Sequence, residues 1–313
     1  MTRDKESGRH QPDGFPLVTR HLSLVTPSAY GGEMPLVNEE QVAAFQRDGF
    51  VVIPDLLSAA ELDLFGGAVD AAVAARMRWD QRRLEEKSRY EQSFQQCLNL
   101  WEDHPGVRPL TFHPRLAEAA TRLLGVPALR LWHDQALYKE AGGRGTDAHQ
   151  DQPYWPMHET ATITAWIPFD GSTLDGGAMG YVPGSHRFGV RKFVNIFFGE
   201  PDDLLAAPEA RGVEPVFVEV PRGAVAFHHG LTFHVAKPNQ TAQTRRVHTL
   251  IFFRDGATRS SAQPHPCVDR PGIAVGAPID SAVTPLVWPR HGDELPPPPP
   301  RPRERSWGWP PEA

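Results

Sequence analysis

Residues 148–155 read AHQDQPYW and place His149 two positions before Asp151. On an extended strand, side chains at i and i+2 point to the same face, so we expect this imidazole and this carboxylate to project together. A histidine from a distant strand would complete a face of three ligands around one metal ion. Two histidines and one carboxylate, with the remaining positions open, are typical of non-haem Fe(II) oxygenases.

The distant histidine is not decided by this pattern alone. With 14 histidines in the chain, a single His-x-Asp also fits an ordinary hydrogen bond between the two side chains. The downstream candidates are His228, His229, His234 and His248. Strand alternation over residues 245–254 separates Arg245 from His248 and Arg246, which fall on the opposite face. A guanidinium matches a carboxylate bidentately, so Arg245 suits the distal carboxylate of 2-oxoglutarate and Arg246 suits a surface ion pair.

The bulk composition indicates a globular protein. The chain has 313 residues, enough for one large domain or two small ones, and 40% of them are hydrophobic. A net charge of −6 argues against nucleic acid as a partner, because such binding relies on basic groups that contact phosphates. Cys97 and Cys267 form neither a metal-ligand spacing nor a disulfide framework, which fits a reducing cytosol.

The two ends of the chain differ from its centre. Residues 1–35 are polar and are expected to be a flexible lead-in, and residues 291–313 are expected to be a proline-rich disordered tail. A tail that binds a proline-recognising domain stays open as an alternative. Residues 36–290 contain no linker-like stretch and are expected to form one domain. Without a signal peptide or a run of about 18 apolar residues, we expect a cytoplasmic protein with no membrane partner. The oligomeric state is left undecided.

The predicted elements are helices first and strands afterwards. Capping boxes at 38–41 and 58–61 open two helices, and a third fits residues 114–124 before Gly125. A short β-branched run at 50–53 separates the first two. Later strands are predicted at 130–139, 160–169, 176–183, 213–220, 224–228 and 245–254. Many strands without intervening helices predict a mainly β fold with flanking helices, namely a double-stranded β-helix (jelly roll, cupin-like).

Four stretches resemble the phytanoyl-CoA dioxygenase family of Fe(II)/2-oxoglutarate-dependent oxygenases. They read FQRDGFVVIP at 45–54, AHQDQPYW at 148–155, YVPGSH at 181–186, and RGAVAFHHGLTFH at 222–234 followed by Asn239 and Arg245. The motifs occur in the family's order, and the resemblance covers roughly residues 38–255. It implies the jelly-roll fold, an Fe(II) cofactor, and 2-oxoglutarate and O2 as cosubstrates.

The resemblance also implies roles for individual residues. The family pattern places the distal iron ligand eleven residues before the arginine, which here is His234. His149, Asp151 and His234 would then be the catalytic metal ligands, with Arg245 binding 2-oxoglutarate. The expected reaction hydroxylates an unactivated C–H bond of a small-molecule substrate and releases succinate and CO2. Because related halogenases lack the carboxylate, Asp151 disfavours halogenation.

Further pocket residues follow from strand alternation and from the resemblance. Those expected to line the cosubstrate pocket are Gln135, Lys139, Thr164 and Trp166. An exposed strand end for Lys139 and a core position for Trp166 stay open. Those expected to contact the substrate are Tyr154, Trp155 and Met157. Some family members carry serine two residues after the distal histidine, where this chain has Ala236, so that cosubstrate contact is missing or supplied elsewhere.

Other functions stay open at this point. The same iron chemistry can carry out desaturation, epimerisation or cyclisation, and the residues do not separate these outcomes. From a different class, a non-catalytic jelly-roll protein could bind a metal or ligand without turnover. The presence of all three ligand residues together with Arg245 argues against it, because pure binding does not need all four.

Overall fold

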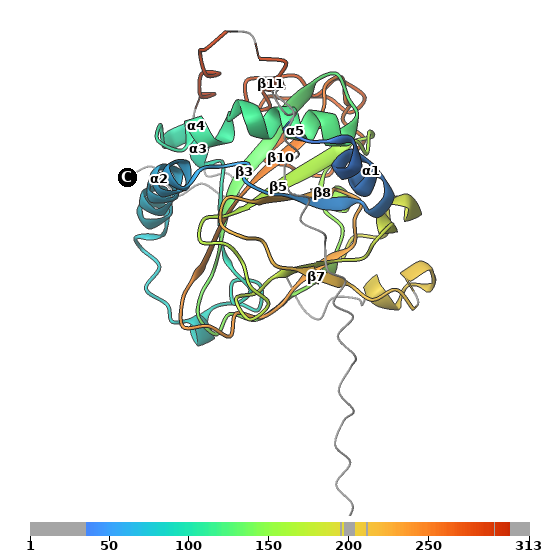
Figure 1. The fold of residues 1–313 in the computed structure, drawn as a ribbon. Helices are drawn as coiled ribbons and strands as arrows, with labels where there is room; N and C mark the ends of the chain where they lie inside the picture. The colour runs from blue at the N-terminus through green and yellow to red at the C-terminus, as the bar shows by residue number, and fades with distance from the viewer. Residues whose placement is uncertain (1–35, 195, 197–203, 211, 291, 301–313) are drawn as a thin grey trace, which may run out of the picture. The chain divides into compact units, whose positions relative to one another are not determined.

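The computed structural model describes residues 36–194, 196, 204–210, 212–290 and 292–300 (Figure 1). Its helices are α1 (Glu39–Asp48), α2 (Ala59–Met77), α3 (Leu100–Asp103), α4 (Arg108–Thr111), α5 (Pro114–Leu124) and α6 (Pro266–Asp269). Its strands are β1 (Phe50–Ile53), β2 (Gln95–Leu98), β3 (Leu129–Lys139), β4 (Thr146–His149), β5 (Thr162–Pro168), β6 (Met179–Tyr181), β7 (Val216–Val218), β8 (Val225–His229), β9 (His234–Ala236), β10 (Arg245–Arg254) and β11 (Leu286–Trp288).

The helix boundaries follow from local capping. Asn38 accepts a hydrogen bond from the backbone N–H of Gln41 at 2.8 Å, and the Gln41 side chain accepts one from the Asn38 N–H at 2.9 Å. Helix α1 ends at Gly49, whose φ of +82° belongs to the left-handed region. A Cβ atom at Gly49 would lie 2.5 Å from Thr232, so the turn into β1 also needs glycine for space.

Two antiparallel sheets form the predicted jelly roll. The larger sheet has the strand order β1-β8-β5-β10-β3-β11, with β2 also paired to β3. The smaller sheet has the order β4-β9-β6-β7. Buried side chains between the sheets include Trp166 and Val247 from the larger and Tyr181 and Val218 from the smaller. The strands of both sheets therefore present one face to a shared interior.

Helices α1, α2 and α5 cover the other face of the larger sheet, as Figure 1 shows. Strand β10 illustrates the alternation: Leu250 and Phe252 pack in the core beneath the helices, whereas Thr249 and Ile251 line the interior cavity. The predicted bounds and the predicted facing of this strand are confirmed. His248 lies on the helix side, fully buried next to Asp134.

Several elements escape prediction because they are too short to show a period. Strands β2, β9 and β11 have three or four residues each and depend on their neighbours in the sheet. Strand β7 is likewise shorter than the stretch predicted at 213–220.

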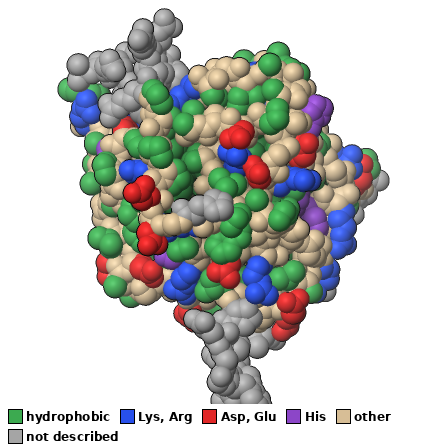
Figure 2. All heavy atoms as spheres, turned by 90° about the horizontal axis from the view of Figure 1, so that it is seen from above, with side chains coloured by type: hydrophobic (Ala, Val, Ile, Leu, Met, Phe, Trp, Pro, Cys, Tyr) green, Lys and Arg blue, Asp and Glu red, His purple; other side chains and the backbone are tan. Residues whose placement is uncertain are grey.

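No helix in the described part of the chain is long and apolar enough to cross a membrane. On the face shown in Figure 2, acidic and basic side chains are interspersed.

Residues 292–300, the described part of the predicted proline-rich tail, contact the domain through arginine side chains. Arg108 donates hydrogen bonds to the carbonyls of Leu295 and Pro296, and Arg270 donates one to the carbonyl of Pro300 at 3.5 Å. Proline lacks an N–H group but keeps its carbonyl acceptor, so arginine side chains can hold such a segment against a domain. Residues 1–35 and 301–313, also predicted to be flexible or disordered, lie outside the described residues.

Candidate active site

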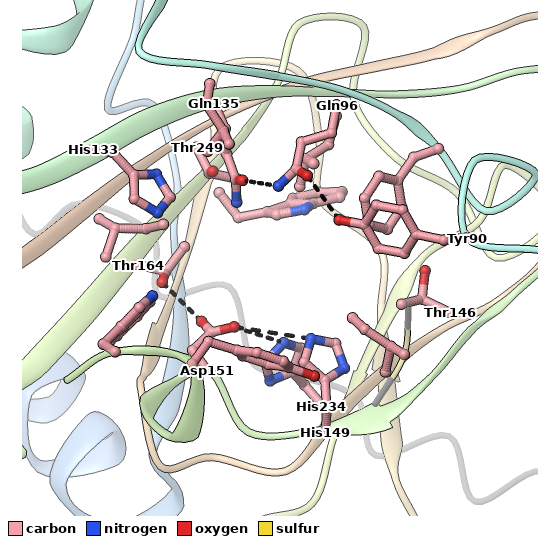
Figure 3. Close-up of a pocket in the computed structure, with 18 of the residues that line it drawn as sticks. Tyr90, Gln96, His133, Gln135, Thr146, His149, Asp151, Thr164, His234 and Thr249 are labelled. Carbon is pink, nitrogen blue, oxygen red and sulfur yellow. Dashed lines mark hydrogen bonds and ion pairs between the residues drawn. The ribbon is translucent and has the colours of Figure 1, made fainter. Parts of the chain in front are cut away.

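His149, Asp151 and His234 meet at the edge of the smaller sheet (Figure 3). Strands β4 and β9 pair with His149 opposite His234, and their ring centroids lie 4.2 Å apart. The Oδ1 atom of Asp151 lies 3.8 Å from His149 Nε2 and 3.5 Å from His234 Nε2. One candidate donor atom from each residue lies within 4.8 Å of the others, which is close enough for one metal ion.

The expected reason for the meeting of His149 and Asp151 is wrong. Strand β4 ends at His149, and Asp151 has helical dihedrals (φ −75°, ψ −40°) at the start of a short 3-10 turn over Gln152–Tyr154. The backbone N–H of Gln152 donates to the carbonyl of Gly230 at 3.0 Å and anchors this turn. The carboxylate therefore reaches the site because the chain turns, and strand alternation does not account for it.

Each histidine is oriented by its second ring nitrogen. Nδ1 of His149 lies 2.8 Å from the carbonyl of Asp147, and Nδ1 of His234 lies 2.9 Å from the carbonyl of Thr232. A carbonyl accepts only, so both rings carry a proton on Nδ1 and keep the Nε2 lone pair for a metal.

The carboxylate of Asp151 is oriented in the same manner. Its Oδ2 atom accepts a hydrogen bond from Thr164 Oγ1 at 3.1 Å and lies 3.2 Å from His228 Nε2. These contacts leave Oδ1 directed towards His149 and His234. Thr164 lines the cavity as expected, and its hydroxyl is directed to Asp151, because β5 runs directly beside the turn that carries this carboxylate.

The other candidate histidines lie elsewhere. His228 contacts the Oδ2 atom of Asp151 through its Nε2 atom. His229 packs against Phe45 of α1, with ring centroids 6.5 Å apart. His248 lies on the helix-covered face of the larger sheet. Among the four histidines left open by the sequence, His234 is the one whose ring joins His149 and Asp151.

The charge states of these three side chains suit a divalent cation. Burial lowers the pKa of His149 and brings the pKa of His234 down to about 3, so both imidazoles are neutral near pH 7. Burial alone would raise the pKa of Asp151, but His234 and His228 hold it well below its usual value. Two neutral imidazoles and one carboxylate are the deprotonated donors that Fe(II) requires.

A buried cation lies in the same cavity. Arg245 donates from Nη1 to the carbonyl of Gly177 at 2.6 Å, and its guanidinium lies 5.2 Å from the ring centroid of Trp166. Its Nε atom is buried without a hydrogen-bond partner, and no described residue forms an ion pair with it. Burial lowers the pKa of Arg245 to about 10, so it stays charged. By contrast, Arg246 forms surface ion pairs with Asp170 and Asp70.

Two buried polar groups were missed by the sequence analysis. The hydroxyls of Thr249 and Tyr181 are buried, and each lacks a hydrogen-bond partner among the described residues. Thr249 shares the cavity-facing side of β10 with Arg245, so strand alternation could have predicted it as a pocket residue. Tyr181 belongs to a three-residue strand that carries no such signal.

The cavity has a volume of about 550 Å³ and contains most of the predicted pocket residues. Gln135, Thr164, Trp166, Tyr154 and Trp155 line it, together with Arg245 and the three candidate metal ligands. A hydrogen-bond chain reaches Gln135 across the upper wall in Figure 3: Tyr90 donates to Gln96 at 2.8 Å, and Gln96 donates to Gln135 Oε1 at 2.6 Å. This direction leaves the amide N–H groups of Gln135 for a ligand.

Lys139 and Met157 do not line the cavity, contrary to expectation. The Nζ atom of Lys139 donates to the carbonyls of Ser93, at 2.7 Å, and Arg144. Burial lowers the pKa of Lys139 to about 6. Its long stem carries the amino group past the strand face to the nearest backbone acceptors, which strand alternation cannot predict. Met157 packs in a hydrophobic cluster with Trp155.

A model of the family described as Phytanoyl-CoA dioxygenase (PhyH) matches residues 45–247. This chain belongs to the phytanoyl-CoA dioxygenase family. A methylphosphonate hydroxylase from Gimesia maris is 24% identical over 219 residues, which cover 69% of this chain and 80% of that protein. A probable alpha-ketoglutarate-dependent hypophosphite dioxygenase from Stutzerimonas stutzeri is 29% identical over 122 residues, covering 38% of this chain and 43% of that protein.

Solved structures agree with the family assignment. The alpha ketoglutarate-dependent carbocyclase SnoK from nogalamycin biosynthesis has 28% identity and a TM-score of 0.67, covering 82% of this chain and 99% of that chain. The epimerase SnoN, solved with Fe3+, alpha ketoglutarate and nogalamycin RO, has 25% identity and a TM-score of 0.66, covering 80% and 98%. The protein is a 2-oxoglutarate-dependent dioxygenase, with Fe(II) as its cofactor and 2-oxoglutarate and O2 as cosubstrates. Nothing in these comparisons supports a non-catalytic binding protein.

Proposed function

We propose that the protein hydroxylates an unactivated C–H bond of a small-molecule substrate. The overall reaction joins substrate, 2-oxoglutarate and O2 and yields an alcohol, succinate and CO2, so one oxygen atom enters each organic product. The observation that supports this most directly is that one cavity holds both the His149, Asp151 and His234 donor set and the buried cation of Arg245, which forms no ion pair with any described residue. Bound iron supplies the oxidative chemistry, and the protein supplies placement and electrostatics.

The residues divide the work according to their contacts. His149 and His234 would hold the iron through Nε2 and Asp151 through Oδ1, while Thr164 keeps that carboxylate in place. Arg245 would bind the distal carboxylate of 2-oxoglutarate, since a buried carboxylate is costly unless a cation pairs with it.

The positions of the candidate metal ligands and of Arg245 define the path that 2-oxoglutarate would follow. Strand β9 runs from His234 towards Ala236, which pairs with Met179, and the carbonyl of nearby Gly177 holds Arg245. The cosubstrate would therefore extend from the iron ligands along β9 towards Arg245. Ala236 lines this path and offers no hydroxyl.

Cyclisation or epimerisation is a second candidate outcome, because SnoK and SnoN are similar over most of this chain. The metal site does not distinguish these reactions, since all begin with removal of a substrate hydrogen. The reactions differ in which substrate group reacts after this hydrogen has been removed.

A mass measurement separates the outcomes. The Fe(II)-loaded protein is incubated with 2-oxoglutarate, isotopically heavy O2 and a library of candidate small molecules, and products are analysed by mass spectrometry. Hydroxylation predicts a product that gains one heavy oxygen atom, with stoichiometric succinate. Cyclisation or desaturation instead removes hydrogen, and epimerisation leaves the mass unchanged in ordinary water. Succinate coupled only to products without added oxygen would contradict the proposal, and His149→Ala serves as the inactive control.

A further inference from the structure

The end of the cavity away from Arg245 carries two histidines that the metal site does not use. His133 lies on β3 opposite Ile251 of β10, which pairs on its other side with Thr164 (Figure 3). His265 is the N-cap residue of α6. The two rings are nearly parallel, with centroids 6.0 Å apart and an interplanar angle of 20°. His265 also stacks on Trp132, with ring centroids 4.5 Å apart.

Both imidazoles have hydrogen-bonding capacity to spare. Nδ1 of His265 accepts from the backbone N–H of Cys267 at 3.2 Å, so the neutral ring carries its proton on Nε2, across the ring. Nδ1 of His133 is fully buried, whereas its Nε2 is not and has no hydrogen-bond partner in the described part of the chain, so Nε2 is the atom of this ring that is open to the cavity. The residues are 6% and 8% exposed, and a polar atom in such a buried place is costly without a partner. A ligand in the cavity that hydrogen-bonds to the two Nε2 atoms would remove this cost.

No free cation lies at this end among the described residues. Arg270 lines the cavity but is paired with both carboxylate oxygens of Glu102, each at 2.9 Å. Asp269 is likewise occupied by Arg259 at 2.7 Å. At the other end, the charges of Fe(II), Asp151, dianionic 2-oxoglutarate and Arg245 cancel. An anionic substrate would therefore be buried without a counter-charge, which is unfavourable.

Aromatic side chains also line the cavity. The side chains that line it include Tyr90, Phe94, Tyr154, Trp155 and Phe193. Tyr154 and Phe193 meet edge to face at 4.9 Å, and Tyr90 and Phe94 meet in the same manner at 5.1 Å. Flat apolar faces favour planar or fused rings, and about 550 Å³ accommodates more than the cosubstrate alone.

We propose that His133 and His265 form the substrate-recognition end of the cavity and select an uncharged, ring-bearing compound with hydroxyl or carbonyl oxygens. The cavity would disfavour anions such as the one-carbon phosphonate that a relative's name implies. This inference rests on the proposed function and adds the substrate class. His133 is its main specificity-determining residue, because it lies on the sheet that also positions the residues around Asp151.

A matched pair of probes tests the charge preference. We suggest 2-(hydroxymethyl)anthraquinone and anthraquinone-2-carboxylate, which share their rings and differ in charge. Each is titrated by equilibrium dialysis against the anaerobic Fe(II)- and 2-oxoglutarate-loaded protein. The uncharged probe is expected to bind at least about tenfold more tightly. Equal affinities, tighter binding of the carboxylate, or no binding of either probe would overturn the proposal.

Variants test the role of His133. His133→Leu is expected to weaken binding of the uncharged probe by about tenfold, the equivalent of one buried hydrogen bond, and His133→Gln is expected to restore most of it. His158→Gln, which changes an exposed histidine, is the matched control. If His133→Leu does not fold, the comparison of His133→Gln with His133→Phe replaces it. Equal affinity in all folded variants would refute the role.

These outcomes are separable from those of the proposed function. Probe binding is measured without O2, so it does not depend on which reaction follows. A protein that prefers the uncharged probe but adds no oxygen to any product would refute hydroxylation alone. A protein that hydroxylates an anionic substrate would refute the recognition proposal alone.

Discussion

Replacing Arg245 with methionine separates the binding role of this side chain from its structural one. The guanidinium is buried, makes one hydrogen bond to the Gly177 carbonyl and forms no ion pair with any described residue. Methionine keeps much of the stem volume and removes the charge. Loss of the bond to Gly177 costs about 1 kcal/mol of folding free energy, and removal of an unpaired buried charge offsets it. We therefore expect little change in the stability of the cosubstrate-free protein.

The effect on 2-oxoglutarate binding is expected to be much larger. A hydrogen bond to a charged group contributes about 1.5–3 kcal/mol, and a bidentate guanidinium–carboxylate pair contains two of them. Arg245→Met should then weaken cosubstrate binding by about 3 kcal/mol, or roughly 100-fold in Kd. Arg245→Lys keeps a charge without the planar fork and should lose about tenfold.

The assay is an anaerobic titration of the Fe(II)-loaded protein with 2-oxoglutarate, followed by the visible metal-to-ligand charge-transfer band. Arg246→Met is the matched control, because Arg246 pairs with Asp170 at 2.6 Å on the opposite face of β10. The control should leave the Kd for 2-oxoglutarate unchanged and cost at most about 1 kcal/mol of stability. An Arg245→Met protein that folds, binds iron and keeps its cosubstrate affinity within about threefold would refute the reasoning.

Three further predictions concern the metal site and its surroundings. His149→Ala should abolish Fe(II) binding, measured as metal content after dialysis, and stoichiometric iron in this variant would contradict the ligand assignment. Thr164→Val should weaken Fe(II) binding by about 10- to 100-fold, because Asp151 loses a hydrogen-bond donor, and an unchanged affinity would remove that role. The metal-free protein should lose stability below about pH 6: burial holds the pKa of His234 at about 3 and the pKa of His229 at about 4, below the value of about 6.5 in the unfolded chain. Between these pKa values the unfolded state binds more protons than the folded state, so each of these histidines lowers the free energy of unfolding by about 1.4 kcal/mol per pH unit of acidification. Equal free energies of unfolding in urea at pH 7 and pH 5 would argue against this prediction.

The long elements of this fold were predictable because each carries its own periodic signal. Residues 245–254 alternate over ten positions, and strand β10 has those bounds. Helix α5 likewise has the predicted bounds, since Pro114 begins it and Gly125 ends it. The three-residue strand β9 carries no usable period, although it holds a candidate metal ligand. Its existence depends on pairing with β4 and β6, which lie far away in the chain.

In the candidate site, too, some residues could be assigned from the sequence and others only from the tertiary structure. Sequence alternation alone left four histidines as the distant ligand, and the family resemblance was needed to single out His234. Alternation also placed Lys139 on the face of Gln135 but could not show that its ammonium turns to loop carbonyls. The tail interaction through Arg108 was similarly unpredictable, because an arginine shows no preference in sequence for one distant carbonyl.

The sequence by itself determined the class of fold, the family, and the residue types available for iron and 2-oxoglutarate. These follow from local backbone geometry, which sets the facing of neighbouring side chains, and from motifs in a fixed order. Only the tertiary structure decided that Asp151 reaches the site through a turn, that Arg245 is buried without an acidic partner among the described residues, and that His133 and His265 stack at the far end of the cavity. Burial, pairing and the lack of a partner depend on which distant segments pack together, and no short stretch of sequence encodes that packing by itself.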